Sequence, residues 1–312
     1  MAGNPHLYYT AVGIAKEAAW GTAVPRTAFI PILEPRFNPR NIAHVLEEGY
    51  RGQAAMDYDL IGGVGQGEWG WTGALYVDTF PHLLLNLMGK VTKSGAGPYQ
   101  HLFQAGTPPS HTIEWGQDVQ PYVLAGARAS RLALNFNGRD GTLRYTIQGQ
   151  SKLGATCVLT PAAWTELAGL AGWQGNVTVG GAQPAVMTEA ELVFERQIKL
   201  SRGLANTQDP GNMWQGPLRL SGRLTFEFTA KTEYEYAASN TPAKNAVVMT
   251  FSRAANEQIV LTMTKCGWRQ SEIGTDEIIY TAVANINALQ NTTDAGPCQV
   301  EVSNQIATAY DA

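Results

Sequence analysis

The stretch Gln66 to Val77, QGEWGWTGALYV, returns later in the chain as Gln215 to Phe226, QGPLRLSGRLTF. Both copies read Gln-Gly, four residues, Thr or Ser, Gly, one residue, Leu. In the first copy polar and apolar positions alternate, and Trp69 and Trp71 fall on the same side. That alternation is typical of a half-buried β-strand and not of a helix. We therefore predict a strand in each copy.

The repeat also includes residues outside the predicted strand. The copies lie 149 residues apart, and a second marker, Arg51-Gly52 before the first copy and Arg202-Gly203 before the second, lies 151 residues apart. A long period of this kind indicates a duplicated structural unit. We expect residues 1–184 to hold an N-terminal arm and a first β-unit, and residues 185–312 to hold a second, with the connector near Gly180-Gly181.

The remaining patterns also favour β-structure. Thr79 is placed to begin a short helix that Gly89 ends, and the apolar residues from Phe80 to Met88 share one face of it. A second helical patch is expected at 161–170. Short apolar or alternating runs predict further strands at 29–33, 99–103, 111–115, 131–136, 142–148, 191–194, 259–264, 278–284 and 299–302. The segment 35–65 has no period and several glycines, so we expect a long loop that contacts a neighbouring subunit.

Composition limits the possible functions. Charged residues make up 15% of the chain, against about 25% in an average soluble protein, so large self-association interfaces are expected to cover the surface. The net charge of −4 argues against a surface built to grip nucleic acid. Cys157, Cys266 and Cys298 form no CxxC pair and are expected to be unpaired thiols. Neither a membrane span nor a signal peptide is expected.

Motifs for chemistry are weak. The five histidines show no HxH or HExxH spacing, so no metal site and no cofactor are expected. His101 lies among aromatic and apolar residues and is assigned to packing or an interface. The segment Gly65–Gly70 matches GxGxxG, but it opens an alternating β-pattern and no helix, so the match is taken as accidental.

One enzymatic alternative stays open on the residues alone. The acidic pairs Glu47-Glu48, Asp57/Asp59, Glu233/Glu235 and Asp276-Glu277 would suit a glycosidase, and Trp69, Trp71, Trp115 and Trp268 would suit a carbohydrate-binding β-sandwich. Solvated faces for the acids and core positions for the tryptophans are the favoured interpretation, so no catalytic residue is assigned.

An ordered set of short motifs resembles the tail tube (major tail) proteins of long-tailed, siphovirus-like bacteriophages. The set consists of Gly13–Glu17 with Trp20–Ala23 and Pro25, the apolar run Phe29–Leu33, the Gly-rich entry to Gly67–Gly73, Tyr99–Phe103, and Pro109–Ile113. The resemblance implies a mainly β fold of two tandem sandwich-like or barrel-like units, each with a short flanking helix and long loops. It also implies a structural virion protein that is not an enzyme.

In that family, subunits join edge to edge into rings, and the rings stack into a tube through which DNA is ejected. The implied partners are other copies of the chain, a tape measure protein, a tail terminator and viral DNA in transient, non-specific passage. The implied location is the virion tail, and the host cytoplasm during assembly. A minor tail or tube-capping protein of the same fold is an alternative. Because the chain is duplicated, we favour a homotrimeric ring with pseudo-sixfold symmetry over a homohexamer.

We assign a set of residues to subunit or ring interfaces on these grounds. They are Trp69, Trp71, Gly52, Gly62, Gly63, His101, Leu218, Leu220 and Arg202. The lumen of the tube is expected to be neutral or net negative, because fixed cations would hold the phosphates of passing DNA.

Overall fold

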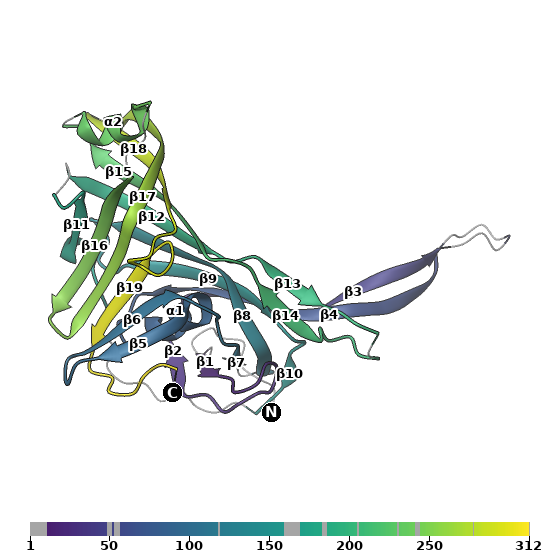
Figure 1. The fold of residues 1–312 in the computed structure, drawn as a ribbon. Coiled ribbons are helices and arrows are strands. Elements are labelled where there is room, and N and C mark those ends of the chain that lie inside the picture. The colour runs from purple at the N-terminus through teal and green to yellow at the C-terminus, as the bar shows by residue number, and fades with distance from the viewer. Residues whose placement is uncertain are drawn as a thin grey trace.

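The computed structural model describes residues 11–48, 52, 57–117, 119–158, 169–182, 186–204, 206–229, 231–240, 244–276 and 278–311. Within them the chain is mainly β-structure, as predicted (Figure 1). The strands of the first half are β1 (Ala11–Lys16), β2 (Ala28–Ile30), β3 (Glu34–Glu48), β4 (Asp57–Ala74), β5 (Gly89–Ser94), β6 (Tyr99–Ala105), β7 (His111–Gly116), β8 (Tyr122–Asn137), β9 (Arg144–Ser151) and β10 (Ala155–Thr156). Those that follow are β11 (Gly175–Val179), β12 (Met187–Glu195), β13 (Ile198–Ser201), β14 (Asn212–Gln215), β15 (Arg219–Glu227), β16 (Lys244–Ala254), β17 (Glu257–Asp276), β18 (Ile279–Ala288) and β19 (Gln299–Asn304).

Eight of these strands form one continuous antiparallel series. In spatial order they are β3, β4, β9 and β8, followed directly by β12, β15, β18 and β17. The second four strands repeat the pairing scheme of the first four. The join between the two sets is the β8–β12 pair, in which Leu134 lies opposite Leu192.

The repeated sequence stretch occupies the same place in both sets. Its first copy lies largely in β4 and its second copy in β15, each of them the second strand of its set. The glycines of the two copies are also equivalent, because Gly73 lies opposite Tyr145 in β9 and Gly222 lies opposite Ile286 in β18. A Cβ atom on either glycine would come within 2.6 Å of a neighbouring side chain. The shared glycine therefore makes room for a packed partner.

One face of the eight-strand series is the core. A single row of buried side chains crosses five strands through Trp71, Ile147, Leu132, Phe194 and Leu220. The buried apolar residues of both halves belong to one continuous cluster. The registers thus place the apolar positions of every strand on the same side of the sheet.

A short helix lies against this core in each half. Helix α1 (Phe80–Met88) packs on β8, and α2 (Thr232–Ala238) packs on β17 and β18. Helix α1 has the predicted bounds, and it ends at Gly89, whose φ of 96° is left-handed. Asn86 of α1 binds the β8 backbone directly, accepting from the Ala129 N–H at 2.5 Å. The second predicted helix, at 161–170, falls almost wholly on residues 159–168, outside the described residues.

The segment 35–65 is not the loop that we predicted. β3 and β4 pair out to Glu48 and Asp57 and form a two-stranded hairpin that projects from the body (Figure 1). We call residues 39–48 and 57–65 of this hairpin the arm. We predicted a loop because the segment contains several glycines. Gly63, however, packs so close to the opposite strand that a Cβ would meet the Ala43 oxygen at 2.6 Å. Glycine here serves close backbone approach, not flexibility.

The N-terminal arm that we predicted includes a paired strand. β1 pairs with β2 on one side and β7 on the other, so residues 11–16 form an inner strand. Residues 1–10 lie outside the described part.

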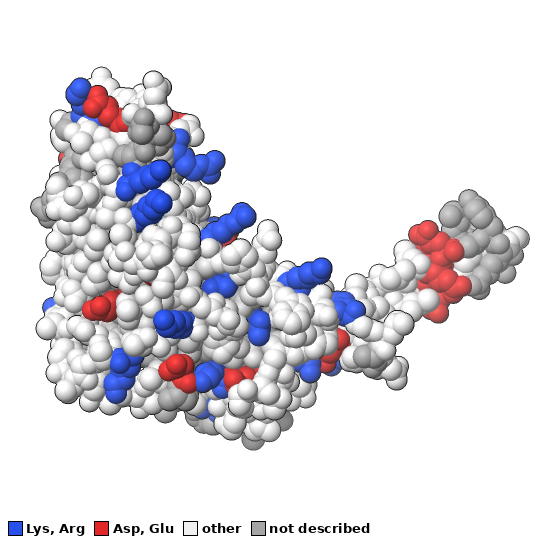
Figure 2. Space-filling view, viewed as in Figure 1, with Lys and Arg blue, Asp and Glu red and all other residues white. Residues whose placement is uncertain are grey.

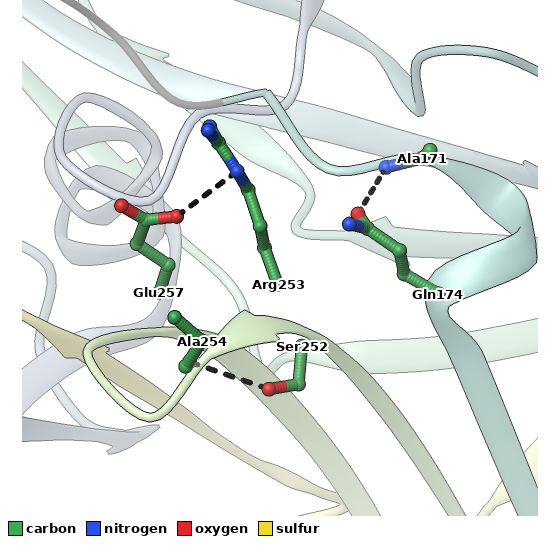
Figure 3. A network of polar contacts seen from close by, with 6 residues as sticks. All are labelled: Ala171, Gln174, Ser252, Arg253, Ala254 and Glu257. Carbon is green, nitrogen blue, oxygen red and sulfur yellow. Dashed lines mark hydrogen bonds and ion pairs between the residues drawn. The ribbon is translucent and has the colours of Figure 1, made fainter.

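At the far side of the second half, a 3-10 turn (Gly172–Gln174) precedes β11, and β11 pairs with β16. The Ala171 N–H donates to Gln174 Oε1 at 2.9 Å, and across the turn between β16 and β17 the Arg253 Nε lies 3.5 Å from Glu257 Oε2 (Figure 3). These contacts fix the turns at this edge of the molecule.

Candidate functional site: the open face, the free edges and the arm

The eight-strand series has an open face opposite its core. Paired residues on this face form rows across the strands, such as Thr72, Thr146, Ala133, Val193 and Ser221. The face is rich in uncharged polar side chains: Asn38, Thr72, Thr146, Gln148, Gln150, Asn135, Asn137, Ser221, Thr225, Asn285, Asn287 and Gln270. No large apolar side chain among the described residues of this face is fully exposed. The described side chains of this face are thus mostly polar.

Charged residues on the open face are mixed in sign. The acidic ones are Glu34, Glu68, Glu189, Glu191, Glu195, Glu227 and Glu272, and the basic ones are Arg36, Arg131, Arg144, Arg219, Arg223 and Arg269. Acidic and basic residues alternate across the middle of the sheet, where Arg131 Nε lies 3.6 Å from Glu195 Oε1. Acidic residues slightly outnumber basic ones, so the face has no net positive charge.

Hollows on the surface of the protein coincide with the open face. One is lined by Arg36, Glu68, Thr72, Gln148 and Gln150, and another by Glu191, Ser221, Arg223, Asn285 and Asn287. Both hollows are shallow; the second is lined mainly by polar groups, and the first also by Trp69 and Trp71. Their chemistry suits solvent or passing polar material better than a tightly held small ligand.

The two ends of the eight-strand series have free edges. Among the described residues, β3 forms a strand pair with β4 alone, and the Gly154 N–H donates to the Pro39 oxygen at 2.6 Å. Among the residues that the structure describes, β17 pairs with β18 alone from Trp268 to Asp276. In the first set, β8 holds the place that β17 holds in the second. Residues 131–135 of β8 are paired on both sides, with β9 and with β12. A sheet edge of this kind is a template for pairing with another chain.

The arm is apolar on both of its faces. Val45 pairs with Ile61, and the next pair, Leu46 with Leu60, points the opposite way because successive residues of a strand alternate. All four side chains are about half exposed, as is Val64. Acidic residues gather near the far end of the arm, at Glu47, Glu48, Asp57 and Asp59 (Figure 2).

The base of the arm is held by a second, shorter hairpin, β13–β14, which comes from the second half of the chain. Arg202 donates to the Gly65 oxygen at 3.0 Å and to Gln66 Oε1 at 3.2 Å. Gln208 donates to the Gly63 oxygen at 3.0 Å. The root of the short hairpin is bound to β8, because Gln215 donates to the Ala129 oxygen at 2.8 Å. The short hairpin thus ties the arm to the body.

The predicted interface residues fall into two groups. Gly62 and Arg202 lie exposed on the arm and at its base, Gly63 is half-buried on the arm, and the exposed Gly52 has a left-handed conformation. Five residues are instead buried within the chain: Trp69, Trp71, His101, Leu218 and Leu220. A surface role is thus open only to the first group.

The five buried residues have packing roles in the chain itself. Trp71 Nε1 donates to the Tyr145 hydroxyl at 3.1 Å, and Trp69 stacks on Trp71 with ring centroids 5.3 Å apart. His101 Nε2 lies 3.0 Å from the Ile306 oxygen. Alternation along the strand identified these positions as one face, but it could not tell the core face from an interface.

Sequence reasoning missed the residues of the open face. They are the polar positions that alternate with the predicted core positions, so the signal was present in the same strands. What the sequence lacked was the order of the strands, which brings these positions together on one surface.

A comparison with known protein families identifies the family to which the chain belongs. The family model described as phage tail tube protein matches residues 10–304, nearly the whole chain. The chain belongs to the phage tail tube protein family. A search of curated proteins finds no match.

Membership gives the protein a structural role as a major tail protein in the bacteriophage virion, assembled with other tail proteins. The three cysteines are free, as predicted. No helix among the described residues is long and apolar enough to cross a membrane.

The features that favoured a carbohydrate site do not assemble into one. Trp69, Trp71 and Trp268 are all at most 3% exposed, so they offer no platform for stacking sugars. The acids at 47, 48, 57 and 59 lie on the arm, whereas Glu235 pairs with Lys231 at 2.9 Å on α2. These groups are distributed over separate parts of the fold.

Proposed function

We propose that this tail tube protein closes into rings and that the rings stack into the tube through which viral DNA is ejected. The observation that carries the proposal is the eight-strand series, in which one four-strand scheme occurs twice and both ends are left unpaired. A sheet of this form can be continued by another copy without any change of fold.

Ring closure follows the pattern of the join inside the chain. In the β8–β12 pair, the last strand of the first set lies antiparallel to the first strand of the second set. The corresponding strands that lack a partner are β17, the last of the second set, and β3, the first of the first set. We propose that β17 of one copy, from residue 268 onward, lies beside the segment at the start of β3 in the next copy.

The two tandem units are part of the same proposal. Each unit contributes four strands of the ring and one helix, α1 or α2. The predicted boundary lies after residue 184, but β11 precedes it and pairs with β16. In the proposal the second unit therefore also takes in β11.

Strand number favours three copies per ring. Three copies supply roughly 24 strands, which at a spacing of about 4.8 Å and a tilt of about 40° close into a barrel about 48 Å across between backbones. Six copies would form a barrel about twice as wide. Because each chain already holds two four-strand sets, three chains supply six sets, and we favour the homotrimer with pseudo-sixfold symmetry over the homohexamer.

The open face would line the lumen, since the helices and the core lie on the other face. Its uncharged polar rows and slight excess of acid avoid fixed cationic sites for phosphate. DNA would pass without being held, in transient and non-specific contact, and a tape measure protein would occupy the same space before ejection. A tail terminator would cover the last ring. Assembly would take place in the host cytoplasm.

The arm would join one ring to the next. Deleting residues 39–65 and linking the remaining strands should leave a folded protein that forms rings but no tubes, because the core ends before the arm begins. Negative-stain electron microscopy of the purified protein and of this deletion tests the proposal. Hollow tubes from the intact chain are expected, and tubes of normal length from the deletion would refute the assignment of the arm. Copy number in the virion separates this role from that of a minor tail or tube-capping protein, which would be present in a few copies only.

A further inference from the structure

Residues 305–311 follow β19 and belong to no strand or helix, yet they are bound to the body of the protein (Figure 1). We call them the strap. Lys93 of β5 donates to the Ala307 oxygen, and Lys16 of β1 donates to the Asp311 oxygen. The strap is thus fastened to two strands that are far apart in the sequence.

Tyr310 is the anchor of the strap. It is 7% exposed, and its hydroxyl donates to the Asp78 oxygen at 3.0 Å and accepts from Asn304 Nδ2 at 2.8 Å. Its ring meets the rings of His82 and His101 edge to face, with centroids 4.8 Å apart in both cases. One tyrosine therefore lies against two histidines, which come from α1 and from β6.

His101 is neutral while the strap is bound. Its Nε2 lies 3.0 Å from the Ile306 oxygen, and because a carbonyl oxygen only accepts, Nε2 carries the proton. Its Nδ1 is buried and has no hydrogen-bond partner among the residues that the structure describes. A second proton would therefore create a buried, charged donor without an acceptor, which is costly.

The surroundings of both histidines disfavour a positive charge. Burial lowers the pKa of His101 from 6.5 by more than its contacts with Ile306 and Asn304 raise it, and the charge of Lys93 lowers it further. Burial also lowers the pKa of His82 from 6.5 to about 4. Protonation of either ring is thus opposed as long as the site stays closed.

The other titratable groups near the strap act in the same direction as the pH falls. His82 faces His111, and positive charges on these two rings would repel each other. Burial raises the pKa of the Asp78 carboxyl, and the charge of Glu257 adds to that rise. Asp78 therefore loses its negative charge at a higher pH than an exposed aspartate does. The exposed Asp311 is the acidic residue of the strap itself.

We propose that the strap is an acid-sensitive device, bound while His82 and His101 are neutral and released, before the body unfolds, when they take up protons. Release exposes both rings to water, so the open form binds protons that the closed form does not. The ratio of open to closed form should then rise as the pH falls below 6.5. The rise is up to about tenfold per pH unit for each histidine, until the pH reaches its pKa in the closed form. Release of the strap is independent of ring formation and goes beyond the proposed function.

Hydrogen exchange with mass spectrometry follows the strap and the body in the same sample of purified protein between pH 7 and 5, with each rate divided by the intrinsic rate at that pH. We expect the protection of residues 305–311 to fall about fivefold or more between pH 6.5 and 5.5. The protection of residues 129–136 in β8 should fall less.

Two variants separate the histidines from the rest of the site. His82→Phe combined with His101→Gln keeps a ring beside Tyr310 and a donor for the Ile306 oxygen, but neither side chain titrates. Its strap should stay bound at pH 7 and lose the pH dependence. Tyr310→Phe is the matched control, because it lacks the two hydroxyl bonds but keeps both ring contacts. Its strap should be less protected at every pH and should keep the pH dependence.

If the protection of the strap and of β8 falls in parallel, acid acts only by unfolding the whole chain, and the proposal is wrong. A pH dependence that persists in the combined variant would also overturn it. Should that variant not fold, NMR titration of the His101 ring in the unmodified protein decides. A pKa well below 6.5 supports the proposal, and a ring that titrates at 6.5 while the strap stays protected contradicts it. Failure to form rings or tubes would overturn the proposed function and leave these results unaffected.

Discussion

Arg202 Nη1 donates to the main-chain oxygen of Gly65 across 3.0 Å, linking the short hairpin of the second half to the base of the arm in the first. The same guanidinium reaches Gln66 Oε1 and the Gln208 oxygen. Three acceptors on two segments make Arg202 the residue that sets the direction in which the arm leaves the body. A planar guanidinium suits several fixed acceptors in a way that an ammonium group does not.

Arg202→Ala should therefore loosen the arm without unfolding the protein. We expect a change of about 1 kcal/mol or less in the free energy of unfolding, because the side chain is exposed and its bonds compete with water. Amide hydrogen exchange in residues 60–66 should rise, and tube formation should fall. Lys199→Ala, on the same hairpin but without such contacts, is the control and should change neither. Unaltered exchange at 60–66 in Arg202→Ala would rule out the clamp.

Trp71 has a different role from the interface position that its sequence pattern indicated. It is 1% exposed and its indole N–H is bound to the Tyr145 hydroxyl. Trp71→Ala should cost about 3–5 kcal/mol of stability through the cavity it leaves. Trp214→Ala, at a residue 60% exposed on β14, should change stability by about 0.5 kcal/mol or less. Urea unfolding of the two variants compares them directly, and equal costs would contradict the assignment of Trp71 to the core.

Stability should depend on pH through His111. Burial, with a smaller contribution from the charge of His82, lowers the pKa of His111 from 6.5 to about 3. Below pH 6.5 the unfolded chain takes up a proton that the folded chain does not, so stability falls as pH decreases from 6.5 toward 3. The slope from this residue is up to about 1.4 kcal/mol per pH unit.

Urea unfolding between pH 7 and 4 measures that slope. His111→Gln should reduce it. Because the His111 variant places a new side chain in the core, titration of the His111 ring by NMR in the unmodified protein is the second measurement. A ring that titrates near pH 6.5 in the folded protein would show that the burial argument is wrong.

The sequence was sufficient for the fold class and for many of the elements. Alternation predicted the strands at Gln66 and Gln215, and α1 begins after Thr79 and ends at Gly89 as predicted, although the Thr79 side chain makes no capping hydrogen bond. These features are local, since each depends on residues within one or two turns or strand steps of one another. The repeated stretch also predicted two strands, and these strands hold equivalent places in the sheet.

The rest depended on contacts between distant residues. Gly62 and Gly63 have the sequence context of loop glycines, but Gly63 allows the close approach of β4 to β3, which only its contact with the Ala43 oxygen reveals. Leu218 and Leu220 could not be assigned from the sequence either, because apolar residues alternate in the same way on a core face and on an interface face of a strand. The open face was missed for this reason too, because no single strand shows which other strands lie beside it.

The central claim is that one chain supplies two of the six equivalent positions in a ring. Cryo-electron microscopy of the assembled tube tests it most directly, by counting the chains in one ring. We predict three chains with true threefold symmetry, β17 of each lying beside the start of β3 in the next. A ring of six chains would contradict the account, because the repeated four-strand sets would then not correspond to ring positions.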